Sequence, residues 1–170
     1  MLPGFVLLAL AAAPAEVGSC ENFGKVGPAL YRGAEPDADC LDHLATLGVR
    51  TIVSLRDDEE DTERERGWAQ ARGIRFENVP MSGFRKPDPA EVLRALELIG
   101  ETGNQPVFVH CKRGRDRTGV VVAAWRMMRE GWSLEQAYEE AKRFRLAWWQ
   151  VRMKDFIREL DVPKSQEGSR

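Results

Sequence analysis

The sequence predicts an α/β domain with a central, largely parallel sheet and helices on both faces. Two observations support this prediction. Short apolar runs, such as residues 49–55 and 106–109, are typical of strands that are buried on both sides in a parallel sheet. The segments between them repeat apolar residues at spacings of three and four, which is the pattern of amphipathic helices. Strands that alternate with helices form parallel sheets, and their crossover helices cover the two faces.

The order of the elements follows from the same patterns. The first turns of two helices are marked by Asp88-Pro89-Ala90-Glu91 and by Ser133-Leu134-Glu135-Gln136, which are capping boxes. The acidic run 57–61 is expected to supply solvated residues to a helix start and not a metal site. Strands are predicted at 49–55, 74–79 and 107–109, and helices at 37–47, 59–72, 89–101, 118–129, 133–145 and 146–160.

The last of these helices carries two adjacent tryptophans. Trp149 lies on its apolar stripe with Leu146 and Met153, so we expect Trp149 to pack in the core. Trp148 lies off this stripe, and its role stays open.

Composition indicates one domain. The chain has 170 residues, 43% of them apolar and 31% charged, which suits a single core. We place the domain at residues 21–162 and a disordered tail at 163–170. The net charge of −2 argues against a protein that binds nucleic acid or acidic membranes as a whole.

The N-terminus has the features of an export signal. Residues 5–13 are an apolar run too short to span a bilayer, and Ala13-Pro14-Ala15 has the form of a signal-peptidase site. We expect residues 1–15 to be removed from a periplasmic or secreted protein. A lipid anchor at Cys20, which would extend the leader to about residue 20, is one alternative, and a cytoplasmic protein is another, because no Lys or Arg precedes the run. In an exported chain Cys20 could also pair with Cys40 and leave Cys111 free.

The segment 110–119 carries the chemistry. It reads His-Cys-Lys-Arg-Gly-Arg-Asp-Arg-Thr-Gly and lies between a buried strand and an apolar helix. A short loop between a strand and a helix N-terminus aims several backbone N–H groups at one point, with the positive end of the helix dipole behind them. Such a cradle binds an anion and should lower the pKa of the Cys111 thiol from ~8.5 toward ~4–7. A nucleophile inside a phosphate cradle predicts phosphoryl transfer through a cysteinyl-phosphate.

This segment resembles the signature loop of the cysteine-dependent protein tyrosine phosphatase superfamily, and it is most similar to the compact dual-specificity branch with its bacterial relatives. Residues 30–36 and 51–56 give weaker support, so the resemblance spans roughly residues 23–156. It implies a dual-specificity phosphatase-like fold and hydrolysis of phosphomonoesters without a metal or other cofactor. The matching signature residues are His110, Cys111, Gly114, Arg117, Thr118 and Gly119.

The resemblance implies roles for individual residues. Cys111 is the nucleophile, and Arg117 clamps two phosphoryl oxygens with its planar guanidinium. Thr118 can hydrogen-bond the sulfur and help it to leave. We expect the substrate to be bound by the loop residues Lys112, Arg113, Gly114, Arg115, Asp116 and Thr118.

Two residues are candidates for the proton donor to the leaving group. The family carries it as an Asp on a loop before the signature, and Asp88 is the carboxylate of the matching loop 81–88. Asp88 also reads as the N-cap of the following helix. Asp116 is the second candidate, but we expect it to be tied to Arg115 or Arg117, which would make it a poor proton donor.

Two neighbours of the loop are given other roles. His110 and Cys111 are adjacent on a strand, so their side chains point to opposite faces and His110 is a poor general base for the thiol. We expect His110 to hold the loop by hydrogen bonds. Arg56 ends another strand and could either contact the site or cap a helix.

The sequence therefore favours a phosphatase acting on a phosphoprotein, a phosphoinositide or an inositol phosphate. The basic residues of the loop exceed what one phosphate needs and favour a highly phosphorylated substrate. A phosphate-binding adaptor that does not turn over is the alternative from another class. A rhodanese-like sulfurtransferase explains Arg117-Thr118-Gly119 less well.

Overall fold

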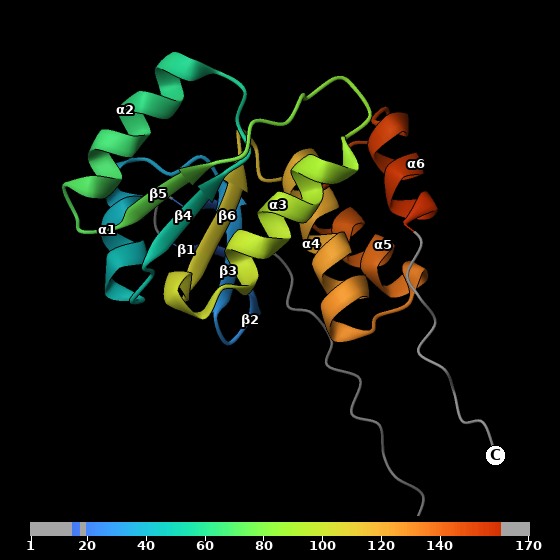
Figure 1. Cartoon of the computed structure of the whole chain (residues 1–170), viewed down its shortest axis with the longest axis horizontal. Coiled ribbons are helices and arrows are strands. Elements are labelled where there is room, and N and C mark those ends of the chain that lie inside the picture. The colour runs from blue at the N-terminus through green and yellow to red at the C-terminus, as the bar shows by residue number, and fades with distance from the viewer. Residues whose placement is uncertain (1–14, 18–19, 161–170) are drawn as a thin grey trace, which may run out of the picture.

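The computed structural model describes residues 15–17 and 20–160, and in this part of the chain one six-stranded sheet forms the centre of the molecule (Figure 1). The strand order is β1-β2-β3-β6-β4-β5. Strands β3, β6, β4 and β5 are mutually parallel, and β2 and β1 extend the sheet antiparallel. The predicted largely parallel sheet is confirmed. The strands are β1 (Ala15–Val17), β2 (Cys20–Gly27), β3 (Leu30–Ala34), β4 (Thr51–Ser54), β5 (Arg75–Asn78) and β6 (Val107–Cys111).

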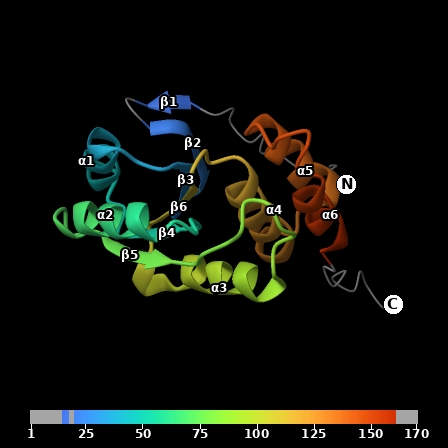
Figure 2. The same ribbon diagram turned by 90° about the horizontal axis from the view of Figure 1, so that it is seen from above.

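Helices cover both faces of this sheet, as predicted. Helices α1 and α2 lie on one side, and α3 to α6 lie on the other side (Figure 2). No helix within the described residues has the length and apolar character that a bilayer crossing requires. The helices are α1 (Ala38–Thr46), α2 (Glu59–Gln70), α3 (Pro89–Gly100), α4 (Asp116–Glu130), α5 (Leu134–Arg143) and α6 (Val151–Glu159).

Strand β6 is central and is buried on both faces. Its residues Val107, Val109 and Cys111 belong to the core beneath α3 to α6. Phe108 belongs to the other core, beneath α1 and α2, and the ring of His110 stacks on it. Alternate residues of a strand point to opposite faces, so this placement fixes the thiol and the imidazole on opposite sides of the sheet.

The helices begin where their caps predict. Asp88 caps α3 and Ser133 caps α5, each in a capping box, and Asp37 and Asp58 cap α1 and α2. Such caps satisfy backbone N–H groups in the first turn that have no partner within the helix.

The end of the chain differs from its prediction. The expected helix 146–160 begins only at Val151, because the segment before it bonds to the loops near Cys111. The N–H of Ala147 donates to Asp116, and the Gln150 amide donates to the carbonyl of Gly83. Trp149 therefore precedes the helix and is 56% exposed, so the prediction that it packs in the core is wrong.

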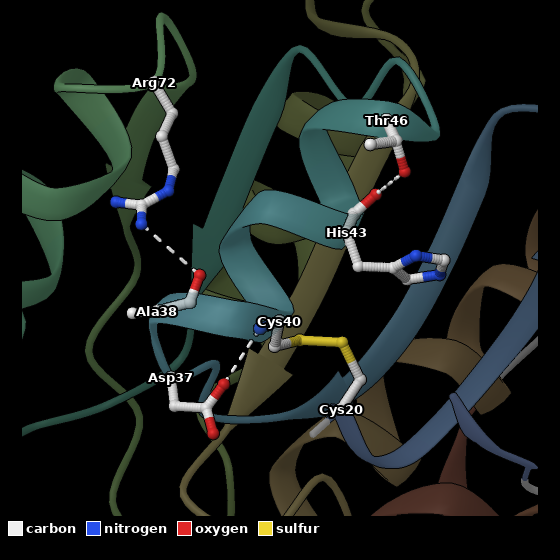
Figure 3. Close-up of a disulfide and its surroundings, with 7 residues drawn as sticks. All are labelled: Cys20, Asp37, Ala38, Cys40, His43, Thr46 and Arg72. Carbon is white, nitrogen blue, oxygen red and sulfur yellow. Dashed lines mark hydrogen bonds between the residues drawn. A yellow bond between two sulfur atoms is a disulfide. The ribbon is translucent and has the colours of Figure 1, made fainter. Parts of the chain in front are cut away.

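A disulfide joins Cys20 in β2 to Cys40 in α1 and leaves Cys111 as a free thiol (Figure 3). A sulfur in a disulfide cannot also carry a lipid, so this structure supports the pairing and not the lipid anchor at Cys20. The predicted leader lies outside the described residues except for Ala15, and the predicted tail 163–170 lies entirely outside them. Export of the chain stays a prediction.

Candidate active site

The thiol of Cys111 lies at the carboxyl edge of the parallel strands. Strand β6 ends at Cys111 and helix α4 begins at Asp116, so the connecting loop (112–115) is only four residues long. The neighbouring strands end beside it, with Ala34 of β3 in register with Cys111. Ligands of open α/β sheets bind at this edge, and the predicted position of the site is confirmed.

The loop is shaped by its contact with β3. Gly114 has φ of +62°, and a Cβ there would lie 2.3 Å from the carbonyl oxygen of Gly33, so only glycine permits this approach. The carbonyl of Gly114 accepts hydrogen bonds from the Arg32 guanidinium at 2.9 Å and from the Asn22 amide at 2.8 Å. The back of the loop is therefore attached to β2 and β3.

The loop favours the thiolate of Cys111. The side chain is buried, and burial alone would raise the pKa of the thiol. The nearby side chain and N–H of Thr118, the charge of Arg117 and the N–H of Arg113 outweigh burial and lower it. The direction of the predicted pKa shift is confirmed, and its cause is the loop itself.

His110 supports the strand from the opposite face. Its Nε2 lies 2.8 Å from Oε1 of Glu65 in α2, and both side chains are buried. Burial alone would lower the pKa of His110, but the Glu65 carboxylate outweighs it and the pKa is raised. With its ring turned toward Glu65, His110 is not placed to accept the proton of the thiol. Its Nδ1 lies 3.4 Å from the carbonyl oxygen of Cys111, and its predicted role of holding the loop by hydrogen bonds stays a prediction.

Arg117 is anchored through one nitrogen. NH1 donates to the carbonyls of Leu55 and Met81 at 3.2 and 2.9 Å, and it lies 2.7 Å from Oδ1 of Asp57. Within the described part of the chain, no hydrogen bond of Arg117 uses Nε or NH2, and both atoms approach Gly83. These two nitrogens remain available to bind two oxygens of one phosphoryl group.

A cavity of about 350 Å³ opens above the thiol. Five of the predicted site residues line it together: Cys111, Lys112, Arg113, Asp116 and Arg117. The other lining residues are Arg56, Asp57, Asp58, Gly83, Phe84 and Gln150.

Three predicted binding residues lie behind or beside the cavity. Gly114 and Thr118 are buried at its back. Gly114 shapes the loop, and Thr118 lies next to the sulfur. Arg115 points aside, with its guanidinium 3.9 Å from Glu21. Among residues 15–17 and 20–160, no group of three or more His, Cys, Asp or Glu side chains could hold a metal ion.

The structure does not bring Asp88 to the thiol. Its carboxylate accepts the N–H of Ala90, and its own N–H donates to Glu91, so Asp88 serves as the helix cap that the sequence also indicated. It lines a separate surface hollow with Ser82 and Arg85. A role as the proton donor would require the loop to move, and this role stays a prediction.

Asp116 lies in the cavity wall without an arginine partner. Its Oδ1 accepts the N–H of Ala147 at 2.9 Å, and among the described residues it forms no ion pair. The expected tie to Arg115 or Arg117 is therefore wrong. The reason is that segment 147–150 folds over the loop, and the N–H of Ala147 binds the Asp116 carboxylate in place of an arginine.

The sequence reading missed the role of the acidic run. Asp58 caps α2 as expected, but Asp57 anchors Arg117 and Asp61 binds Arg56 at 2.6 Å. Arg56 thus lines the cavity, which is the first of its two predicted roles. It also binds the first turn of α2 through Asp61, but the cap of that helix is Asp58. One signal for Asp57 was available, because it lies just beyond the carboxyl end of β4, the parallel strand next to β6.

Other contributors had no local signal. Gln150 and Phe84 line the cavity, and Asn22 and Arg32 hold the loop from behind. They come from segments far apart in the sequence, and only the tertiary fold brings them together.

Known proteins share both the sequence and the fold. Dual specificity protein phosphatase TpbA of Pseudomonas aeruginosa is 35% identical over 123 residues, which cover 72% of this chain and 54% of TpbA. Inositol diphosphatase DSP1 of Oryza sativa is 32% identical over 145 residues, which cover 83% of this chain and 64% of DSP1. This chain thus spans less than two thirds of the length of either relative.

A solved structure matches at the level of the whole domain. The core catalytic domain of PP-IP phosphatase SIW14 from Saccharomyces cerevisiae superimposes with a TM-score of 0.77 and 28% identity, and the match covers 86% of this chain and 89% of that one. The predicted dual-specificity phosphatase-like fold is confirmed. A model of the tyrosine phosphatase family matches residues 19–170, and the chain belongs to this family.

Proposed function

We propose that the protein hydrolyses phosphomonoesters through a cysteinyl-phosphate intermediate, without a metal ion. The observation that carries this proposal is a thiol of lowered pKa at the base of a cavity that also holds an anchored arginine. Its family and the names of its relatives, a dual specificity phosphatase and an inositol diphosphatase, agree with this activity.

The reaction has two steps. The Cys111 thiolate attacks phosphorus, the bond from phosphorus to the leaving oxygen breaks, and that oxygen takes a proton from an acid. Water then attacks the cysteinyl-phosphate and gives a proton to the conjugate base of that acid, and the bond from phosphorus to sulfur breaks. Inorganic phosphate and the thiolate are released, and Thr118 stabilises the thiolate. Arg117 and the loop N–H groups stabilise the equatorial oxygens in both steps.

We propose Asp88 as the acid of the first step, because general acid catalysis would contribute more than the loss of its helix cap costs. Asp88 is exposed and lies on the loop whose residues Gly83 and Phe84 already line the cavity. Giving up an N-cap costs ~1 kcal/mol. General acid catalysis contributes about 10²- to 10⁴-fold, or roughly 3–5 kcal/mol, which exceeds that cost. Asp57 is committed to Arg117 and Asp116 to the N–H of Ala147.

The preferred substrate is proposed to carry several phosphates. Lys112 and Arg113 are exposed at the cavity, and neither forms an ion pair within the described residues. The N–H groups of the loop and Arg117 are sufficient to bind one phosphoryl group. The two extra charges therefore suit neighbouring phosphates, as in an inositol phosphate or a phosphoinositide, more than a single phosphotyrosine.

Replacing Cys111 by Ser should abolish turnover but preserve binding of phosphate, because the backbone N–H groups of the cradle remain. Arg117→Ala should lose both. Hydrolysis of para-nitrophenyl phosphate in the presence of EDTA measures turnover, and calorimetric titration with phosphate measures binding. If the serine variant kept a tenth of wild-type turnover, the cysteinyl-phosphate mechanism would be wrong.

Asp88→Asn keeps a capping oxygen and removes the acid, so it should affect substrates according to their leaving group. We expect a loss of about 10²- to 10⁴-fold in kcat on an inositol phosphate and a much smaller loss on an activated aryl phosphate. Asp57→Asn, which weakens the anchor of Arg117, should slow both substrates equally. The Asp88 assignment fails if Asp116→Asn shows the leaving-group pattern and Asp88→Asn behaves like the wild type.

The double variant Lys112→Met/Arg113→Met should narrow the preference for a multiply phosphorylated inositide over a phosphotyrosyl peptide, measured as the ratio of the two kcat/KM values. Arg50→Met/Arg129→Met removes two exposed cations that do not line the cavity and is the matched control. A preference for the phosphotyrosyl peptide that is the same in all three proteins would show that these charges do not select the substrate.

A further inference from the structure

Arg32 of β3 is a fully buried arginine that the reaction scheme above does not use. Its side chain is 0% exposed, and its guanidinium stacks on the ring of Phe144 at 3.9 Å. NH2 donates to the carbonyl of Gly114, but Nε and NH1 are buried without a hydrogen-bond partner. Burial lowers the pKa of Arg32 to about 10, so the group still carries its charge near neutral pH. An incompletely paired buried charge destabilises a fold, and this cost calls for a compensating role.

The contact with Gly114 orients the loop. Asn22 adds hydrogen bonds from its amide to the carbonyls of Gly114 and Arg113, at 2.8 and 3.3 Å. The C=O and N–H of a trans peptide unit point in opposite directions. Drawing the carbonyls of Arg113 and Gly114 toward β2 and β3 therefore turns the N–H groups of Gly114 and Arg115 the other way, toward the mouth of the cradle.

The surroundings of Arg32 are built to admit it. A Cβ on Gly24 would lie 2.5 Å from the Phe144 ring and 3.5 Å from Cγ of Arg32, so the stacked pair needs glycine at that position. A Cβ on Gly114 would collide with the Gly33 carbonyl, so the loop reaches Arg32 only as glycine. The Asn22 amide also donates to the carbonyl of Phe144 at 3.2 Å, which holds the stacking ring in place.

We propose that Arg32 is a positioning residue for the phosphatase reaction, which holds the signature loop from behind and adds a fixed positive charge on the inner side of the Cys111 thiolate. This role rests on the proposed function. The attraction is mutual, because the Cys111 thiolate favours the charged form of Arg32, as does Glu140. Arg32 is not among the residues that line the cavity, so it acts through the loop and through its field.

The test compares two buried arginines. Arg32→Met removes the charge and the donor, and Arg126→Met removes a buried arginine that is held by Glu140 at 2.7 and 2.9 Å, away from the cavity. We expect Arg32→Met to keep or raise the midpoint of denaturant unfolding, since an incompletely paired buried charge is replaced by an apolar side chain. We expect kcat/KM for para-nitrophenyl phosphate to fall about 10- to 100-fold. Arg126→Met should lower the midpoint of denaturant unfolding, because the buried Glu140 carboxylate loses its partner. The value of kcat/KM per folded molecule should stay that of the wild type.

A second readout separates positioning from packing. The acidic limb of the kcat/KM profile follows ionisation of the thiol in the free enzyme. Loss of a nearby positive charge raises the thiol pKa, so the limb should move to higher pH in Arg32→Met and stay in place in Arg32→Lys. Vanadate binding should weaken in Arg32→Met, because the Gly114 carbonyl loses the Arg32 donor and Asn22 alone orients the loop N–H groups.

These measurements test the role of Arg32 separately from the proposed phosphatase activity. If the wild type hydrolyses para-nitrophenyl phosphate and Arg32→Met matches it in kcat/KM and in the acidic limb, the role of Arg32 is refuted and the proposed function stands. A loss that only follows the folded fraction also refutes it. If Arg32→Met does not fold, Arg32→Lys decides, since the proposal requires an unshifted limb with weaker vanadate binding. A wild type without hydrolysis would refute the proposed function itself.

Discussion

The close approach of the Gly114 peptide to strand β3 is the contact on which the rest of the site depends. It needs glycine with a positive φ at position 114, where a Cβ would collide with the Gly33 carbonyl. It also needs donors from β2 and β3 to the carbonyls of Arg113 and Gly114, which point away from the cavity. Given this contact, the N–H groups of the short loop and the N-terminus of α4 converge before any substrate is bound. A preformed cradle of this kind stabilises an anion with little reorganisation, which suits both a thiolate and a phosphoryl group.

Concentrating so much positive charge at one edge of a sheet requires matched carboxylates. Arg56 is bound by Glu35 and Asp61, and Arg117 by Asp57. These anchors fix the two arginines at the cavity wall. On the far face of β6, Glu65 holds His110 in the same way. The acidic start of α2 is therefore part of the site and also the beginning of a helix.

The sequence predicted several features with a local cause, but it did not predict strands β1, β2 and β3. The signature loop, the parallel sheet around it and the helix caps at Asp88 and Ser133 all follow from neighbouring residues, and the structure confirms them. Interactions between distant segments were not predictable in this way. Asn22 and Arg32 reach the loop only because β2 and β3 lie beside β6, and Trp149 is exposed because segment 147–150 bonds to the site and delays the last helix. Apolar spacing does not register such competing hydrogen bonds.

The central claim is that the loop alone, without metal or substrate, holds Cys111 as a thiolate. The most direct measurement is the rate of alkylation of Cys111 by iodoacetamide as a function of pH in the metal-free protein. Because the loop lowers the pKa of the thiol, we predict a midpoint below the ordinary cysteine value of ~8.5. We also predict that saturating phosphate protects the thiol. A midpoint at or above the ordinary value, with no protection by phosphate, would contradict the account.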